Sequence, residues 1–177
     1  WSSDVCSSDL FLQYATWTAC LQWVHCMKQV NKSVLLWYSA SEMYRLVTDV
    51  PRYPQFLPWC DRAEVLSEHD DGVTARLGLA FAGLHQSFTT RNHHEVDRTV
   101  HMELVEGPFS TLEGTWHFLP LGDPGPDGRQ ACKVTLDLRY AFAGRALDAA
   151  LSPVFDRVAN TLMDAFVSRA QAVYGAR

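Results

Sequence analysis

The chain has 177 residues, of which 47% are hydrophobic and 20% charged, values typical of one globular domain with a core of its own. Its formal net charge is −5, and its lysines and arginines are scattered along the chain. A general nucleic-acid binder presents a basic face to the phosphates, so the sequence argues against DNA as a partner. Any contact with RNA or a ribosome would have to be local and shape-specific.

The N-terminal stretch differs from the rest of the chain. Residues 1–26 contain no lysine or arginine, so they lack the basic region of a secretory signal. Their apolar part, 11–24, is too short and too polar for a membrane span. The opening WSSDVCSSDL resembles a translated cloning adapter. We therefore expect residues 1–26 to be a non-native or disordered extension, and the domain to comprise residues 27–177.

The five cysteines show no CxxC spacing, so the sequence supports neither a zinc site nor a thioredoxin-like motif. Three of them lie within residues 1–26. The other two, Cys60 and Cys132, are expected to be free thiols in a reducing compartment.

Residues 28–37 alternate in polarity and predict a β-strand. Either Ser39 or Ser41 can cap a helix, and Glu42 lies three residues after Ser39, as a capping box requires, so we expect a helix from there to about Val50. The next segment, 51–60 (PRYPQFLPWC), holds three prolines and four large apolar residues. Prolines at this density forbid a long regular element, so we expect a short helical turn folded over the domain.

Between residues 61 and 142 the hydrophobic pattern has period two, which predicts about six antiparallel strands with one covered and one solvated face. Asp70, Asp71 and Gly72 mark a hairpin turn. The Gly- and Pro-rich stretch 121–130 is expected to be an exposed loop.

Residues 145–174 return to a helical period and would span roughly 45 Å at 1.5 Å per residue. Pro153 either kinks this helix or stands at the first position of a new helix capped by Ser152. The apolar positions that define the period are Leu147, Leu151, Phe155, Val158, Leu162, Phe166 and Val173.

These elements predict an α+β fold in which a curved antiparallel sheet wraps around a long C-terminal helix. The sequence has no βαβ repeat and no Gly-rich phosphate loop, so a nucleotide-binding fold is not expected.

Several segments resemble one known group of proteins. They are YPQFLPWC (53–60), FTTRN (88–92), LVEGPF (104–109), WHF (116–118) and FVSRAQAVYGAR (166–177). Together they resemble the coenzyme-Q-binding START-domain proteins and their bacterial RatA relatives, within the helix-grip SRPBCC superfamily, over essentially all of the predicted domain.

This resemblance implies a START-like fold with a hydrophobic tunnel between sheet and helix. It implies non-enzymatic binding of ubiquinone or a similar prenyl lipid in support of respiration, with no required cofactor. The protein would be cytoplasmic and would contact the inner membrane face transiently. The RatA relatives imply an alternative, in which a toxin binds the large ribosomal subunit and blocks subunit association. The quinone role is ranked first, because the charge and the apolar faces fit it better.

A second alternative is a polyketide cyclase/dehydratase-like enzyme, since the superfamily also contains such enzymes. This reaction would need an acid or base inside the tunnel. Tyr140 and Asp137 are the nearest candidates, and no nucleophile–base pair is apparent.

The candidate ligand-binding residues fall in three groups, although core packing explains any single one of them more simply. The first group forms either a gate for an apolar ligand or a loop packed on the core: Tyr53, Phe56, Leu57 and Trp59. The predicted tunnel wall consists of Leu79, Phe81, Phe88, Met102, Leu104, Trp116 and Phe118. The predicted roof consists of Phe155, Val158, Leu162, Met163 and Phe166.

Two polar features of the sheet are interpreted as structural. Arg91 could donate hydrogen bonds to a quinone carbonyl, but strand alternation places it opposite Phe88, on the outer face. The sheet histidines do not have the spacing of three or four convergent ligands, so no metal site is expected from His85, His93, His94, His101 and His117.

Overall fold

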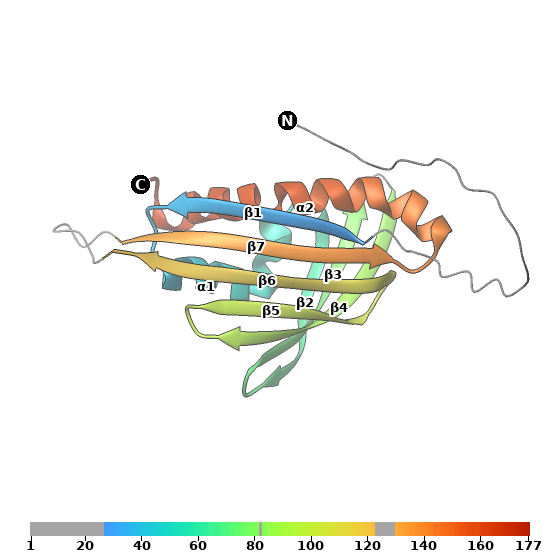
Figure 1. Cartoon of the computed structure of the whole chain (residues 1–177), viewed down its shortest axis with the longest axis horizontal. Helices are drawn as coiled ribbons and strands as arrows, with labels where there is room; N and C mark the ends of the chain where they lie inside the picture. Colours follow the sequence, from blue (N-terminus) through green and yellow to red (C-terminus); the bar gives the residue numbers. More distant parts are fainter. Residues whose placement is uncertain (1–26, 82, 123–129) are drawn as a thin grey trace, which may run out of the picture.

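The computed structural model describes residues 27–81, 83–122 and 130–177. In these ranges the chain forms an antiparallel sheet, two α-helices and a short 3₁₀ helix, η1 (Figure 1). The extension predicted for residues 1–26 lies outside the described residues, as does most of the loop predicted at 121–130. In chain order the elements are β1 (Lys28–Leu36), α1 (Ala40–Thr48), η1 (Val50–Gln55), β2 (Cys60–His69), β3 (Gly72–Phe81), β4 (Leu84–Glu95), β5 (Thr99–Glu106), β6 (Phe109–Leu121), β7 (Ala131–Phe142) and α2 (Arg145–Tyr174).

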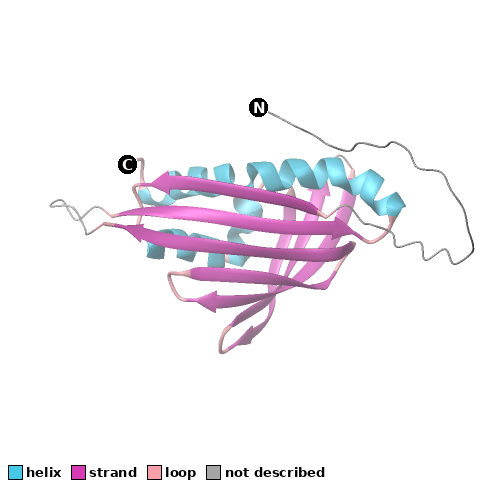
Figure 2. Cartoon of the chain, viewed as in Figure 1, coloured by secondary structure: helices cyan, strands magenta, loops and turns pink. Residues whose placement is uncertain are grey.

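The strands lie in one sheet in the order β1-β7-β6-β5-β4-β3-β2. The strands from β2 to β7 form a meander, and β1 pairs antiparallel with β7 at one edge. Figure 2 shows α2 running along β1 and β7, while β2, β3 and β4 turn across it. The predicted α+β architecture, with a curved sheet around a long C-terminal helix, is therefore confirmed.

The curvature of the sheet has a local cause in irregular strand pairing. A β-bulge adds a residue to one strand of a pair, which bends that strand and increases its twist. Such interruptions let the strands turn around α2 while they remain in one sheet. The register shifts lie between Cys60 and Arg62, Val65 and Ser67, Thr89 and Thr90, and Phe109 and Thr111.

The first helix begins at the predicted capping box. The Ser39 hydroxyl accepts a hydrogen bond from the Glu42 amide at 3.1 Å, and the Glu42 carboxylate accepts one from the Ser39 amide at 2.7 Å. The helix ends at Thr48 and not at Val50, since Val50 and Pro51 already belong to η1. The short helical turn predicted after the helix is η1 itself.

The C-terminal helix α2 is one element of 30 residues over the predicted range. Pro153 lies inside it, so no new helix begins at Ser152. Proline has no N–H to donate to the preceding turn of the helix. Its neighbour Ser152 donates its hydroxyl to the Asp148 carboxylate, one turn earlier in the same helix. None of the helices in the described part of the chain combines enough length with enough apolar character to cross a membrane.

Polar contacts fix both halves of α2 to the rest of the domain. The Asp156 carboxylate accepts hydrogen bonds from the Lys28 ammonium at 2.7 Å and from the Tyr140 hydroxyl. Near the C-terminal end, the Tyr174 hydroxyl donates to the Glu42 carbonyl at 3.2 Å. These contacts join α2 to β1, β7 and α1, so the helix has a defined position over the sheet.

Cys60 and Cys132 are buried free thiols, as the sequence predicted. Burial raises the pKa of each to about 11. Both thiols are therefore protonated at neutral pH and behave as small apolar side chains.

Candidate functional site

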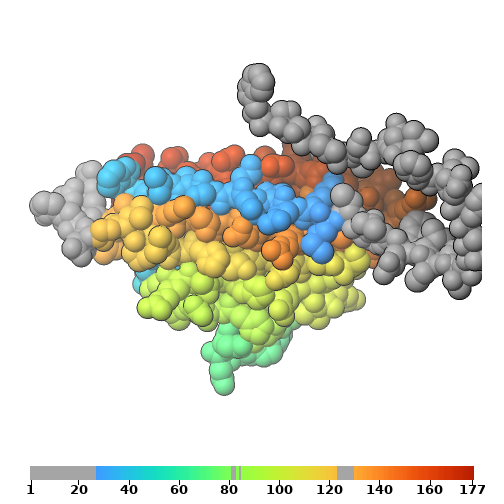
Figure 3. All heavy atoms as spheres, viewed as in Figure 1, coloured from blue at the N-terminus to red at the C-terminus, as the bar shows by residue number. Residues whose placement is uncertain are grey.

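An apolar cavity of about 70 Å³ lies between the inner face of the sheet and α2. The sheet separates the cavity from solvent on the side away from α2. Figure 3 shows the outer face of the sheet, where β1, β7, β6 and β5 lie side by side as an unbroken surface. Residues of η1 and of the loop that follows it close one part of the cavity. The three structural groups predicted from the sequence therefore do meet around one space.

Predicted residues from each group line this cavity. The segment 50–59 contributes two of them, the sheet contributes three and α2 contributes four. They are Tyr53, Trp59, Phe88, Met102, Trp116, Phe155, Val158, Leu162 and Phe166.

Three predicted residues are buried in the core away from the cavity: Leu57, Phe118 and Met163. The ring of Phe118 contacts Tyr44 of α1, with ring centroids 5.8 Å apart. The inner face of the sheet is longer than the cavity, and α1 covers its other part. Strand alternation predicted the correct face for Phe118, but it carries no information on which helix covers that face.

The remaining predicted residues lie at the margins of the cavity. Phe56 packs edge-on against Phe166, with ring centroids 5.2 Å apart, so it forms a second layer behind the lining. Leu79 faces a separate small hollow near Phe142, and Leu104 packs partly buried against the core. Phe81 belongs to β3, and its side chain is outside the described residues.

The cavity also contains residues that the sequence analysis did not select, most of them small, polar or aliphatic. Position 114 favours glycine for a steric reason, because an added Cβ would lie 2.7 Å from Met102 Cε and 3.0 Å from Leu138 Cδ1. For the residues that lie on strands, the one available signal was the inward parity of their positions. The unselected residues are Val50, Ala75, Leu77, Thr90, Asn92, Leu112, Gly114, Leu138 and Ala159.

The polar groups of the lining differ in whether they have a partner. The Tyr53 hydroxyl donates to the Val47 carbonyl at 2.6 Å, and burial raises the pKa of this tyrosine. Trp59 Nε1 and Asn92 Oδ1 are buried and have no hydrogen-bond partner among the described residues. Since buried polar atoms in native proteins are nearly always paired, these two atoms are exceptions that require an explanation.

The lining contains no acidic, basic or thiol side chain among the described residues. The two residues considered for acid–base chemistry lie elsewhere. Tyr140 donates its hydroxyl to Asp156, and burial together with that hydrogen bond raises its pKa. Asp137 is exposed and pairs with Asn31 of β1 across the edge of the sheet. The cavity is therefore suited to binding an apolar molecule.

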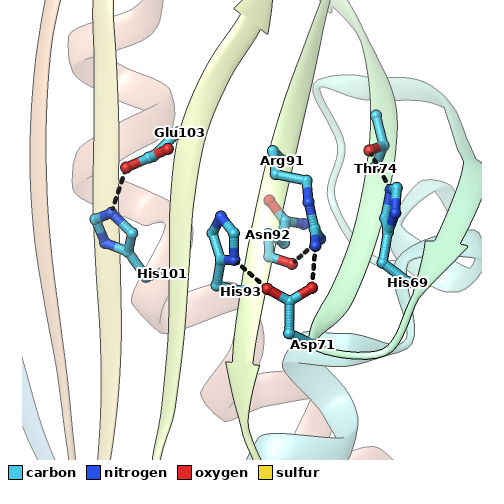
Figure 4. A network of polar contacts seen from close by, with 8 residues as sticks. All are labelled: His69, Asp71, Thr74, Arg91, Asn92, His93, His101 and Glu103. Atoms are coloured by element: carbon cyan, nitrogen blue, oxygen red, sulfur yellow. Dashed lines mark hydrogen bonds and ion pairs between the residues drawn. The ribbon is translucent and has the colours of Figure 1, made fainter.

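Arg91 lies on the outer face of the sheet, as strand alternation predicted. Its guanidinium pairs with Asp71 and donates to the Asn92 backbone carbonyl at 2.9 Å (Figure 4). His93 reaches the same Asp71 carboxylate at 2.8 Å. Hydrogen bonds to His93 and Arg91 lower the pKa of Asp71. The network holds the β2–β3 turn against β4 and does not face the cavity.

His69 and His101 have separate partners. Figure 4 shows His101 beside Glu103 and His69 beside Thr74. His101 Nε2 lies 3.2 Å from Glu103 Oε1, and His69 Nε2 lies 3.0 Å from Thr74 Oγ1. In the described part of the chain, no group of three or more histidine, cysteine or acidic side chains is placed to hold a metal ion.

Comparisons with known proteins show the family of this chain and several relatives. A family model described as polyketide cyclase / dehydrase and lipid transport matches residues 36–167. A Pseudomonas aeruginosa protein named Ribosome association toxin RatA is 44% identical over 146 residues, which cover 82% of this chain and 97% of that protein. A Xenopus laevis protein named Coenzyme Q-binding protein COQ10 homolog B, mitochondrial, is 28% identical, over 83% of this chain and 59% of that protein.

Solved structures share the fold. An 18 kDa protein from Caulobacter crescentus superposes with a TM-score of 0.64 and 32% identity, covering 84% of this chain and 99% of its own. The Zhui aromatase/cyclase from Streptomyces sp. R1128 superposes with a TM-score of 0.65 and 22% identity, covering 82% and 94%. At that level of identity, the second likeness concerns the fold alone.

Proposed function

The chain belongs to the polyketide cyclase/dehydrase and lipid transport family, and on this basis we propose that it binds ubiquinone or a similar prenyl lipid without catalysing a reaction. The observation that carries the proposal is the apolar lining of the cavity under α2. A prenyl tail gains about 0.8 kcal/mol for each CH₂ group moved out of water, so the tail supplies most of the affinity. The similarity to a protein named for coenzyme Q binding gives independent support.

The size of the cavity indicates that the ligand enters by moving part of its wall. Pockets for drug-sized ligands measure roughly 300–1,000 Å³, whereas this cavity measures about 70 Å³. Tyr53, Phe56 and Phe166 form a ring cluster between η1 and α2, with centroids 5.2–5.8 Å apart. The Arg169 guanidinium covers the outer side of Phe56 at 5.3 Å. We assign the gate to this cluster, because it joins the two elements that must separate.

The test is to recover the ligand from the purified protein. Organic extraction followed by mass spectrometry should yield an isoprenoid quinone in stoichiometric amount. Leu162 is a half-buried residue of α2 that lines the cavity, so Leu162→Asp places a charge in the apolar lining. This variant should no longer retain the quinone, while its circular dichroism stays that of a folded protein. Leu119→Asp is the matched control, because Leu119 is 57% exposed. Full retention by Leu162→Asp would rule out the cavity as the binding site.

The same proposal implies a location for the protein. A carrier of a prenyl lipid must exchange it with a membrane, so we place the protein in the cytoplasm with transient contact at the inner membrane face. The charge and the absence of a basic stripe suit a brief contact better than a permanent one.

A second candidate function is association with the large ribosomal subunit, and it is favoured by the name of the 44% identical relative. The net charge of −5 means that such binding would rest on a local surface. Co-sedimentation with purified large subunits over a rising salt series tests it. Binding that is missing even at low salt would eliminate this function.

A further inference from the structure

Trp59 and Asn92 line the cavity, and each has one buried polar atom without a partner among the described residues. Resting on the proposed function, we propose that Trp59 and Asn92 are the hydrogen-bonding partners of the ligand's head group. We further propose that this pair selects a ring carrying a hydroxyl group, so that the reduced hydroquinone binds more tightly than the oxidised quinone.

The first argument is burial. Trp59 is 7% exposed and Asn92 is 6% exposed, and both line the cavity. Neither Trp59 Nε1 nor Asn92 Oδ1 has a partner among the described residues. Leaving such an atom unpaired destabilises the folded protein, so a site of this kind is expected where a ligand supplies the missing bond.

The second argument is that both residues are held in place by their backbones. The Trp59 carbonyl accepts a hydrogen bond from the Ala80 amide at 2.9 Å, which fixes the start of β2. Asn92 lies within β4, paired with Val73 on one side and Met102 on the other. Its backbone carbonyl is bound on the outer face by Arg91 at 2.9 Å. The side chains are therefore presented by a rigid frame, as a binding site requires.

The third argument is the chemistry of the two groups. The indole N–H can only donate a hydrogen bond, and the amide oxygen can only accept one. A quinone carbonyl accepts from Trp59 but leaves Asn92 Oδ1 unpaired. A hydroquinone hydroxyl serves both types of partner, whereas an alkylbenzene serves neither. The expected order of affinity is therefore hydroquinone, then quinone, then alkylbenzene.

The experiment measures affinity by calorimetry with three probes that have the same decyl tail. They are 2,3-dimethoxy-5-methyl-6-decyl-hydroquinone kept reduced under argon, the corresponding quinone, and decylbenzene. One hydrogen bond corresponds to roughly a fivefold change in Kd. The wild-type protein should bind the hydroquinone roughly fivefold more tightly than the quinone, and decylbenzene more weakly than either.

Two variants separate the roles of the pair. Asn92→Leu should remove the preference for the reduced form, and Trp59→Phe should weaken both ring forms roughly fivefold. Asn160→Leu and Trp37→Phe make the same changes at exposed positions and should leave the affinities unchanged. Without ligand, Asn92→Leu should melt at a higher temperature than the wild type, because it removes an unpaired buried atom. An asparagine with a merely structural role would make the variant melt lower.

The outcomes distinguish this inference from the function on which it rests. Equal binding of all three probes by the wild type would keep the apolar cavity as a binding site and overturn the assignment of the pair. A redox preference that persists in Asn92→Leu would overturn the role of Asn92. No binding of any probe would overturn the proposed function and this inference with it.

Discussion

Gly114 offers the most direct test of the cavity, because a single methyl group there should reduce ligand binding without unfolding the protein. Its Cβ would lie 2.7 Å from Met102 Cε and 3.0 Å from Leu138 Cδ1. The first of these atoms is the end of a flexible side chain, so we expect it to shift into the cavity. A methyl group takes a volume of the order of one water molecule, about 30 Å³, which is a large part of the 70 Å³ present.

The magnitudes follow from two opposing effects. Alanine in place of glycine in a strand gains about 0.5–1 kcal/mol from the less flexible unfolded chain. The two tight contacts offset this gain, so the free energy of unfolding of Gly114→Ala should change by less than about 1 kcal/mol. In the ligand complex the cavity is already filled, so the Met102 side chain cannot shift into it. Overpacking there costs about 1–3 kcal/mol, which corresponds to at least a fivefold weaker Kd.

The assay combines calorimetry with a short-tailed quinone and thermal unfolding of the same samples. Gly78→Ala is the matched control, because Gly78 lies in β3 and its Cβ would meet the Asp61 carboxylate. That side chain is 45% exposed and can turn into solvent, away from the cavity. Wild-type affinity in Gly114→Ala, or an equal loss of affinity in Gly78→Ala, would refute the reasoning.

Two further predictions concern the scaffold that positions the cavity. Ser39→Ala should lower the free energy of unfolding by about 1 kcal/mol, since it removes the hydroxyl that accepts from the Glu42 amide, and chemical denaturation measures this directly. Burial raises the pKa of Asp156, but the hydrogen bonds from Lys28 and Tyr140 outweigh it, so the pKa lies below its ordinary value of 3.8. The stabilisation by Asp156 is thus present above that ordinary value and is lost as pH falls through the lowered one. Asp156→Asn should flatten the acid limb of the stability profile below about pH 4, and an unchanged limb would contradict this role.

The sequence was sufficient where the determining interactions are local. Ser39 and Glu42 are three residues apart, and their reciprocal bonds are the ones their spacing predicted. Arg91 was placed outside the cavity by alternation alone, because neighbouring residues of a strand point to opposite faces. The range of α2 followed from its period in the same way.

The sequence was insufficient where the outcome depends on distant elements. Trp116 and Phe118 have the same parity on β6, yet Trp116 lines the cavity and Phe118 contacts α1. On α2, Val173 is 47% exposed while Ala170 is fully buried, the reverse of their hydrophobicity. Ala170 is buried because a small side chain allows close approach of the helix to its neighbours, and this is a property of the packed pair.

Asn92 shows the cost of judging a binding site by apolar pattern. Its neighbour Arg91 could donate hydrogen bonds to a ligand and is the polar residue that the sequence suggests for this role. The sheet turns Arg91 to the outer face and places Asn92 in the wall of the cavity. A neutral amide can be buried in an apolar cavity at moderate cost, whereas a guanidinium cannot be buried there without a counter-charge.

The two candidate functions use different parts of the molecule, and this makes them separable in one protein. Ligand binding depends on the inner face of the sheet and α2, whereas a ribosome must contact the exposed surface. Leu162→Asp alters only the first, so its co-sedimentation with large ribosomal subunits reports whether the two properties are linked. Sedimentation equal to that of the wild type would mean that ribosome association does not require the ligand. A loss that parallels the loss of quinone would mean that the bound lipid sets the conformation that the ribosome recognises.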